Sequence, residues 1–108
     1  MPDLEVFLTS DAEADLQDIL SYIEIHDSKE RSDYVYQRIK KAILNLSAFP
    51  KRGRVVPELK EIGVLEYREV FFKPYRILYF IEAPHVYVIA IFDGRRDLQE
   101  LLHRRLFP

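Results

Sequence analysis

Three β-rich runs follow one another in the second half of the chain, separated only by short turns that contain proline. They span residues 66–72, 75–82 and 86–92, and the turns hold Pro74 and Pro84. Runs rich in β-branched and aromatic residues predict strands, and such short connections favour tight hairpins. Apolar residues fall on both pleat faces of the last two runs, which is typical of central strands. The sequence therefore predicts an antiparallel meander.

A helix is predicted from residue 11 to about residue 27, because apolar side chains recur there at helical spacing. Ser10 and Glu13 fit a capping box, in which the serine hydroxyl accepts a free backbone N–H and the glutamate reaches back. Three aspartates at i, i+4 and i+7 favour a solvated face over a pair of catalytic carboxylates. These are Asp11, Asp15 and Asp18.

A second helix is predicted from residue 28 or 29 to residue 48, where Pro50 ends it, and a last helix from residue 97 to about 106. A short strand over residues 4–9 precedes the first helix, and residues 57–63 predict a turn or a short helical piece. We therefore expect a single α+β domain over residues 1–108, with a helical hairpin on one face of the sheet.

Composition excludes several classes of function. The chain has no cysteine, three glycines and three histidines, so it offers no thiolate site, no glycine-rich phosphate loop and no paired-histidine metal motif. It also lacks a GxSxG nucleophile elbow. No apolar run approaches the ~20 residues of a membrane helix, and the N-terminus lacks a signal-peptide pattern. We expect a cytoplasmic protein with no metal, no cofactor and no membrane partner.

The net charge of −2 conceals an uneven distribution. Residues 1–50 hold five Lys and Arg against ten Asp and Glu, whereas residues 51–108 hold eleven against eight. The sequence thus predicts an acidic helical half and a basic sheet half. Two faces for partners of opposite charge and two solvated surfaces are both open interpretations.

Arginines form the strongest candidate constellation. Arg68 and Arg76 fall inside predicted strands, where a guanidinium needs water, a carboxylate or a phosphate. Glu66 and Glu69 are local partners, so a structural ion pair is the alternative to a binding role. Gly94 permits a turn that would display the next two arginines at the end of the sheet. The candidate binding residues are Arg54, Arg68, Arg76, Arg95, Arg96, Arg104 and Arg105, on a surface suited to nucleic acid or an acidic protein.

The order of these signatures resembles the RelE/ParE superfamily, the toxins of type II toxin–antitoxin systems. The resemblance covers nearly the whole chain and implies a β-α-α-β-β-β-α fold. It is carried by residues 12–19 (AEADLQDI), Leu46 to Pro50, Gly53-Arg54, Glu58-Leu59, Gly63, Tyr67-Arg68-Glu69, residues 75–79 (YRILY) and residues 91–98 (IFDGRRDL).

Two activities separate within that superfamily. RelE-like members cut mRNA on the ribosome and often carry a tyrosine or histidine near the C-terminus, whereas ParE-like members poison DNA gyrase. Here Leu101 or Leu102 fills the tyrosine position, and neither can transfer a proton. The DGRRD segment and the leucines after it also resemble ParE. The resemblance therefore implies a bacterial gyrase inhibitor that acts by binding rather than as an enzyme. It would arrest growth and be neutralised by its antitoxin in a hetero-oligomer.

Two alternatives stay open. The first is a RelE-like endoribonuclease, independent of metal, that uses Arg76, Arg96 and His103 on ribosome-bound mRNA. His103 lies between Leu102 and Leu106 on an amphipathic helix, which weakens its candidacy as an acid–base group. The second alternative is an inactive superfamily member that binds only an antitoxin or its operator complex.

Overall fold

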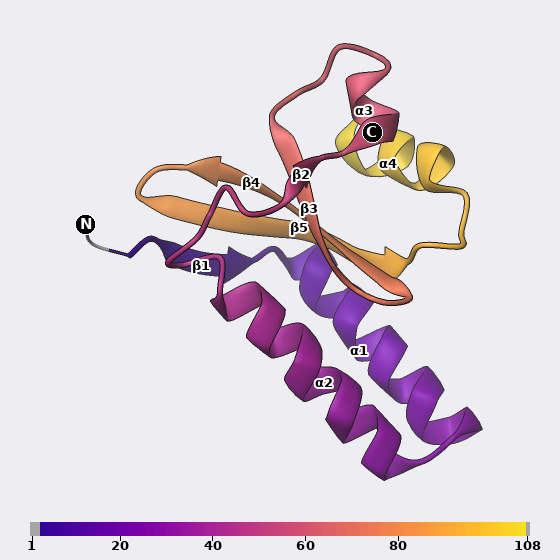
Figure 1. The fold of residues 1–108 in the computed structure, drawn as a ribbon. Helices are drawn as coiled ribbons and strands as arrows, with labels where there is room; N and C mark the ends of the chain where they lie inside the picture. The colour runs from indigo at the N-terminus through magenta and orange to yellow at the C-terminus, as the bar shows by residue number, and fades with distance from the viewer. Residues whose placement is uncertain (1–2, 108) are drawn as a thin grey trace.

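A five-stranded sheet forms the centre of the computed structural model, which describes residues 3–107 (Figure 1). The strand order is β1-β5-β4-β3-β2. β1 pairs with β5 in parallel, and every other pair is antiparallel. The strands are β1 (Glu5–Leu8), β2 (Arg54–Val55), β3 (Tyr67–Phe72), β4 (Tyr75–Glu82) and β5 (His85–Asp93).

The predicted meander is confirmed as β3, β4 and β5, with each end within one residue of its expected position. A register shift occurs where Leu78 pairs with Ala90 and Tyr79 pairs with Val88, so that Ile89 is an extra residue in β5. Ile89 and Ala90 both join the core on the sheet face opposite the helical hairpin. β4 and β5 are therefore central strands with an apolar core on each side, as their two-sided apolar pattern indicates.

Helices α1 (Ser10–His26) and α2 (Lys29–Leu44) form an antiparallel hairpin on one face of the sheet (Figure 1). The apolar stripe of each helix packs on inward-facing strand residues such as Ile77 and Val88. This arrangement confirms the predicted layers. It follows from the helical spacing of the apolar residues, because each helix buries a single stripe.

The N-cap of α1 is Thr9, and the prediction of Ser10 was wrong by one residue. The Thr9 hydroxyl accepts a hydrogen bond from the Ala12 N–H at 3.2 Å. The Thr9 N–H itself donates to Val88 O at 3.0 Å, which holds Thr9 in extended backbone at the end of β1. The pairing of β1 with β5 therefore decides where the helix begins.

Helix α2 ends at Leu44, four residues before the predicted end. A tertiary contact explains the early end. Ser47 O accepts a hydrogen bond from Leu4 N–H at 3.0 Å, and the Ser47 hydroxyl donates to Leu4 O at 2.6 Å. These bonds hold the segment after α2 against Leu4, the residue before β1, in place of a further helical turn.

The second face of the sheet is covered by α3 (Pro57–Lys60) and α4 (Leu98–Leu106). α3 confirms the predicted helical piece, and α4 begins one residue after its predicted start because Asp97 is the N-cap. The two-residue strand β2 was not predicted and lies where the sequence indicated a loop. Among residues 3–107, no helix has the length and apolar character needed to span a bilayer.

Candidate functional site

Arg76 lies at the centre of a buried ion-pair network that joins β3, β4 and α3. Its Nε donates to Glu69 Oε1 at 2.6 Å, and its Nη1 and Nη2 donate to the two carboxylate oxygens of Glu58 at 2.8 and 2.9 Å. Arg54 Nε donates to the other oxygen of Glu69 at 2.8 Å. The Glu69 side chain has no exposed surface, and that of Arg76 is only 10% exposed. Arg76 therefore holds α3 against the sheet.

The electrostatics of the network favour the charged forms. Hydrogen bonds from Arg76 lower the pKa of Glu58 below its ordinary value. Hydrogen bonds to Glu58 and Glu69 raise the pKa of Arg76, against the opposing effect of burial. Of the two carboxylates that the sequence indicated as partners, Glu69 pairs with Arg76, whereas Glu66 is exposed. The second partner of Arg76 is Glu58 on α3, which was not predicted.

Gly94 admits the stem of Arg76. A Cβ at this glycine would lie 3.0 and 3.1 Å from the Cδ and Cγ atoms of Arg76 and 3.2 Å from Pro74 O. The Arg76 guanidinium also lies over the Phe92 ring, 5.6 Å from its centroid. Close approach, rather than a left-handed backbone, is thus the reason for a glycine after β5, because Gly94 has no positive φ.

The basic loop before β2 is fixed by Tyr79 and Arg68. The Tyr79 hydroxyl accepts from Gly53 N–H at 3.0 Å and donates to Pro50 O at 2.7 Å. Arg68 Nη1 donates to Gly53 O at 2.7 Å. Burial raises the pKa of Tyr79. A Cβ on Gly53 would lie 2.5 Å from the Tyr79 hydroxyl, so only glycine fits this position.

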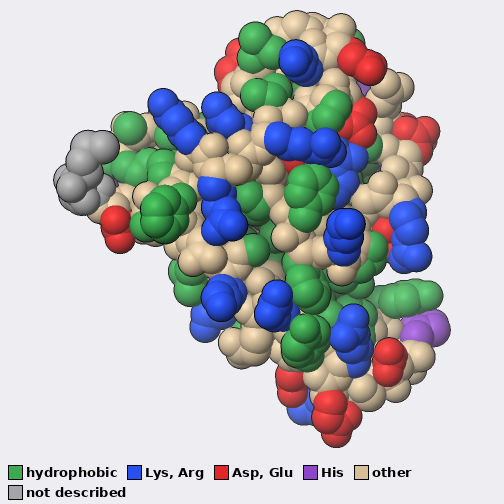
Figure 2. All heavy atoms as spheres, in the orientation of Figure 1, with side chains coloured by type: hydrophobic (Ala, Val, Ile, Leu, Met, Phe, Trp, Pro, Cys, Tyr) green, Lys and Arg blue, Asp and Glu red, His purple; other side chains and the backbone are tan. Residues whose placement is uncertain are grey.

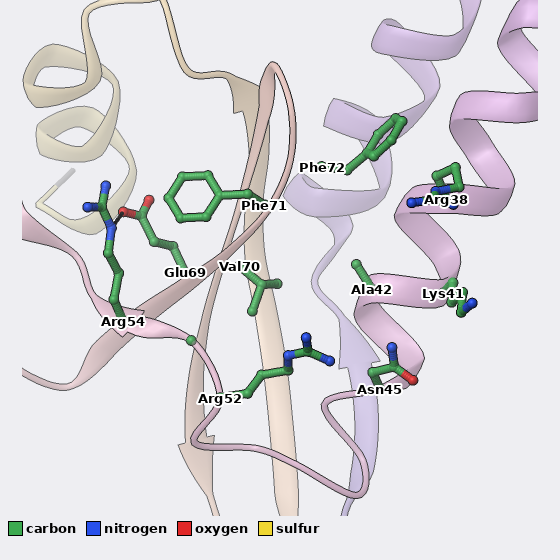
Figure 3. A pocket seen from close by; sticks show the side chains of 11 residues that line it. Arg38, Lys41, Ala42, Asn45, Arg52, Arg54, Glu69, Val70, Phe71 and Phe72 are labelled. Atoms are coloured by element: carbon green, nitrogen blue, oxygen red, sulfur yellow. Dashed lines mark hydrogen bonds and ion pairs between the residues drawn. The ribbon is translucent and has the colours of Figure 1, made fainter.

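A groove of about 480 Å³ lies between α2 and the outer edge of β3, next to this loop (Figure 3). Arg38 lies over Phe72 at 5.4 Å from the ring centroid, and Arg54 lies over Phe71 at 5.0 Å. The lining residues are Arg38, Lys41, Ala42, Asn45, Arg52, Gly53, Arg54, Glu69, Val70, Phe71 and Phe72. We call this feature the basic groove.

Few carboxylates of the chain pair with the cations of the basic groove. Within residues 3–107, Arg38, Lys41 and Arg52 have no ion-pair partner, and Arg54 shares the carboxylate of Glu69 with Arg76. Figure 2 shows Lys and Arg side chains gathered on this face of the molecule. The groove is therefore a site of net positive potential beside exposed aromatic surface.

Sequence reasoning missed Arg38 and Lys41. Both lie on α2, in the half of the chain that was expected to be acidic. All five Lys and Arg residues of that half fall between residues 29 and 41, whereas α1 has only acidic charges. The helical spacing of Arg38, Lys41 and Asn45 places them on one face and was the available signal. The division into an acidic helical half and a basic sheet half was thus wrong for α2.

The other predicted arginines lie elsewhere. Arg95 and Arg96 are exposed and line a second groove of about 650 Å³ between α1 and the β4–β5 end of the sheet. The Arg95 side chain forms hydrogen bonds with Asp93, which lower the pKa of that carboxyl group. Arg104 is exposed on α4, and its Nη2 lies 4.0 Å from Glu100 Oε1. The seven arginines therefore do not line one common cavity.

Arg105 is an internal contact of α4. Its Nη1 and Nη2 donate to the Asp15 carboxylate at 2.6 and 3.2 Å, and Asp15 also accepts from the Ile91 N–H at 3.0 Å. The expectation that Asp15 belongs to a solvated face was therefore wrong. Asp15 sits where α1, β5 and α4 meet, and it is mostly buried.

The three residues of the nuclease alternative are not gathered in one cavity. His103 is exposed and lines a pocket of about 300 Å³ between α3 and α4, with Glu58. Arg96 lines the second groove, and Arg76 is held by two carboxylates. Among residues 3–107, no group of three or more metal-ligating side chains is present.

Comparison with known proteins gives a family and a fold. A family model described as the ParE toxin of the type II toxin–antitoxin system, parDE, matches residues 6–98. No curated protein matches the sequence.

Two solved structures have a similar fold. A chain of the chromosomal ParDE toxin–antitoxin system from P. aeruginosa aligns with a TM-score of 0.69 at 17% identity, over 83% of this chain and 95% of that one. A chain of the RelBE2 toxin–antitoxin complex from Mycobacterium tuberculosis aligns with a TM-score of 0.59 at 21% identity, over 86% and 93% of the two chains.

Proposed function

This chain belongs to the ParE toxin family of type II toxin–antitoxin systems, and from that membership we propose that it inhibits DNA gyrase and is neutralised by a cognate antitoxin. Inhibition would occur by binding: the toxin stabilises the cleaved gyrase–DNA complex, blocks religation and arrests growth. The place of action is then the bacterial cytoplasm. Both structural neighbours come from toxin–antitoxin systems, which supports an antitoxin partner and a hetero-oligomer.

The hydrogen bonds of Arg76 to Glu69 and Glu58 are the observation that most favours a binding function over catalysis. RNA cleavage without a metal needs one group that deprotonates the 2′-hydroxyl and another that protonates the leaving oxygen, near a cation for the phosphate. Here Nε, Nη1 and Nη2 of Arg76 all donate to carboxylates. Two carboxylates beside that guanidinium would also repel a phosphate. This arrangement supports a structural role for Arg76.

We assign the candidate residues to three roles. Arg95, Arg96 and Arg104 are exposed and are proposed to contact the target, while the basic groove with Arg54 is proposed to contact the antitoxin. Three further arginines donate hydrogen bonds within the chain and are proposed to support the fold: Arg68, Arg76 and Arg105.

A supercoiling assay with purified gyrase tests the proposal. We expect the protein to inhibit supercoiling and to increase the amount of cleaved, gyrase-linked DNA. Arg96→Ala is expected to reduce inhibition by about fivefold or more, since removing a contacting charge typically costs over 1 kcal/mol at a binding hot spot. Lys60→Ala on α3 is the matched control, because it removes an exposed charge outside both grooves. Circular dichroism verifies that both variants are folded.

The endoribonuclease is retained as the second candidate because His103 is exposed beside Glu58 in one pocket. Translation reactions programmed with a defined mRNA separate the two activities. Cleavage of translated mRNA that His103→Gln abolishes, together with unchanged gyrase activity, would overturn the gyrase proposal in favour of the nuclease. Absence of both activities, with antitoxin binding intact, would instead favour an inactive member of the family.

A further inference from the structure

A row of four aromatic side chains crosses the sheet on the face opposite the helical hairpin. Val6 of β1 and Val88 of β5 pack in the core under the hairpin. Side chains alternate between the two faces of a strand, so the residues next to these valines lie on the other face. The strand register aligns the four aromatic residues, which are Phe7 on β1, Tyr87 on β5, Phe80 on β4 and Tyr67 on β3.

The rings of this row contact one another from strand to strand. Phe7 and Tyr87 are stacked with their centroids 5.7 Å apart, and Tyr87 and Phe80 are stacked at 5.2 Å. Phe80 meets Tyr67 edge to face at 5.8 Å. Tyr67 and Phe80 pack against the core under α3 and α4, whereas Phe7 and Tyr87 lie outside both cores of the described chain. The row therefore continues from that core onto an open part of the sheet, where Phe7 is 41% exposed.

Two carboxylates lie beside the open end of the aromatic row. Glu5, His85 and Glu82 are aligned on β1, β5 and β4, two residues away from the aromatic row and on the same face. Both glutamates are exposed, and neither has an ion-pair partner among residues 3–107. The His85 ring meets Phe7 edge to face at 5.3 Å and extends the aromatic surface between the glutamates. We call this feature the aromatic–acidic face.

The aromatic–acidic face has the chemistry of an arginine site. A guanidinium stacks on an aromatic ring and donates paired hydrogen bonds to a carboxylate. Two such sets are present on this face, Phe7 with Glu5 on β1 and Phe80 with Glu82 on β4. The carboxylates would repel the phosphates of a nucleic acid, so charge complementarity favours a basic protein segment as the partner.

The spacing of the two sets selects the conformation of that segment. β5 lies between β1 and β4, so the sets are two strand spacings apart, which is about 9.6 Å. A polyproline II helix has three residues per turn and rises about 3.1 Å per residue, so residues i and i+3 face the same side about 9.3 Å apart. Proline-rich segments of this conformation also dock on aromatic surfaces. Two arginines separated by two prolines therefore match both sets.

We propose that the aromatic–acidic face binds a proline-rich basic segment of another protein, with arginines three residues apart. One guanidinium lies on Phe7 and pairs with Glu5, and the other lies on Phe80 and pairs with Glu82. The charge of this partner is opposite to that of a ligand for the basic groove. The face is therefore a second interaction surface, which does not depend on the proposed inhibition of gyrase.

The direct test measures the binding of synthetic peptides to the purified protein by fluorescence anisotropy. The probe is a labelled, blocked peptide of the sequence Pro-Pro-Arg-Pro-Pro-Arg-Pro-Pro. Its comparison peptide, Pro-Pro-Pro-Arg-Arg-Pro-Pro-Pro, has the same composition but directs its arginines to different sides of the helix. We expect the probe to bind about fivefold more tightly, because the comparison peptide can form only one of the two ion pairs. Equal affinity of the two peptides would show that charge alone drives binding and would overturn the proposal.

Replacement of both peptide arginines by lysine tests the stacking. The lysine peptide keeps the charge and the spacing, but an ammonium group is a point charge without the planar fork of a guanidinium. We expect the lysine peptide to bind about threefold or more weakly than the arginine probe. Equal binding of the two peptides would contradict the stacking of arginine on the rings and would overturn the proposal.

Glu82 and Glu24 give a matched pair of variants for the carboxylates. Both side chains are exposed, but Glu24 lies on α1, on the other side of the sheet. Glu82→Gln is expected to weaken binding of the probe about two- to fivefold, the range for one exposed ion pair. Glu24→Gln removes the same charge and is expected to have a smaller effect. Equal effects would show long-range attraction without contact on this face and would overturn the proposal.

Phe7 and Phe71 give a matched pair for the rings, since they are 41% and 44% exposed. Phe71 lies under Arg54 at the basic groove, away from the aromatic row. Phe7→Leu is expected to weaken binding of the probe about two- to fivefold, whereas Phe71→Leu is expected to leave it unchanged. Equal binding by the two variants would overturn the proposal. Urea denaturation verifies that both are folded, and Glu82→Gln keeps the proposal testable if Phe7→Leu is not.

Nuclear magnetic resonance locates the bound peptide. We expect the ring signals of Phe7, Tyr87 and Phe80 to shift when the probe is added, while the amide signals of Arg38 and Lys41 in the basic groove stay in place. Shifts confined to the acidic side chains of α1 would overturn the proposal in favour of a non-specific charge contact. A single-stranded oligonucleotide that shifts the same rings as strongly would overturn it in favour of nucleic acid. These measurements use neither gyrase nor an antitoxin, so their outcome and that of the supercoiling assay are independent.

Discussion

Replacement of Arg76 by methionine removes the guanidinium from the ion-pair network and keeps much of the stem volume. Glu69 has no exposed side-chain surface, so one of its oxygens would lose its donor at 2.6 Å and stay buried. Breaking a buried pair from one side costs about 3–5 kcal/mol. The lower end applies here because Arg54 still donates to the other oxygen at 2.8 Å. We expect Arg76→Met to lower the free energy of unfolding by about 3 kcal/mol.

Urea and thermal denaturation at pH 7, followed by far-UV circular dichroism, measure this loss. A loss of 3 kcal/mol corresponds to a fall of about 12–24 °C in Tm, since 1 kcal/mol shifts Tm by roughly 4–8 °C in a domain near this size. Arg96→Met is the control. Its side chain is exposed and has no ion pair among the residues that the structure describes, so we expect a change within about 0.5 kcal/mol.

A double variant separates the cost of leaving the buried Glu69 carboxylate without Arg76 from the cost of lost packing. In Arg76→Met with Glu69→Met both buried charges are removed, and an apolar replacement of a buried pair is often neutral or stabilising. We therefore expect the double variant to recover at least about 1 kcal/mol of the loss. A cost below about 1 kcal/mol for Arg76→Met alone, or a double variant less stable than the single one, would contradict the stabilising role of the Arg76–Glu69 pair.

Three further predictions concern Glu58 in the network, the Tyr79 hydroxyl and the Arg105 ion pair. Hydrogen bonds from Arg76 hold the pKa of Glu58 below its ordinary value of 4.5. The ionised carboxylate therefore stabilises the folded protein at pH values above the pKa of the unfolded state. This contribution is lost as the pH falls through the lower pKa of the folded state. We therefore expect the urea concentration at the unfolding midpoint to decrease as the pH is lowered below about 4.5, and to decrease less steeply in Glu58→Gln. Tyr79→Phe leaves the Gly53 N–H without its acceptor, and we expect a loss of about 1–3 kcal/mol in urea denaturation; a neutral change would contradict the role of that hydroxyl. Arg105→Ala breaks the pair with Asp15, and hydrogen exchange of the α4 amides is expected to become faster, whereas an unchanged rate would show that apolar packing alone holds α4.

Element type was predictable because periodicity is a local property. The alternation and the short proline turns of the meander determine three strands, and the spacing of apolar residues determines the helices. The two-residue strand β2 was not predicted, and the other errors fell at the ends of elements. Thr9 caps α1 because it pairs with β5, and α2 ends at Leu44 because Ser47 bonds to Leu4. In each case a partner distant in sequence outweighed the local signal.

The candidate site was less predictable than the fold. Sequence reasoning identified arginines as the chemistry-bearing residues and proposed the ion pair with Glu69 as an alternative. It could not anticipate the basic groove, because that groove joins Arg38, the loop at Arg52 and the edge of β3.

Sequence patterns were enough to predict the α+β class, the order of every element except β2, and the cationic character of the candidate residues. The tertiary structure alone decided which of those cations are free. Arg76 and Arg105 resemble Arg96 in sequence, yet their carboxylate partners lie 18 and 90 residues away in Glu58 and Asp15. Periodicity reports which side of an element is buried, whereas an ion pair depends on which elements meet. The cations available for binding are therefore those that the fold does not use in internal ion pairs.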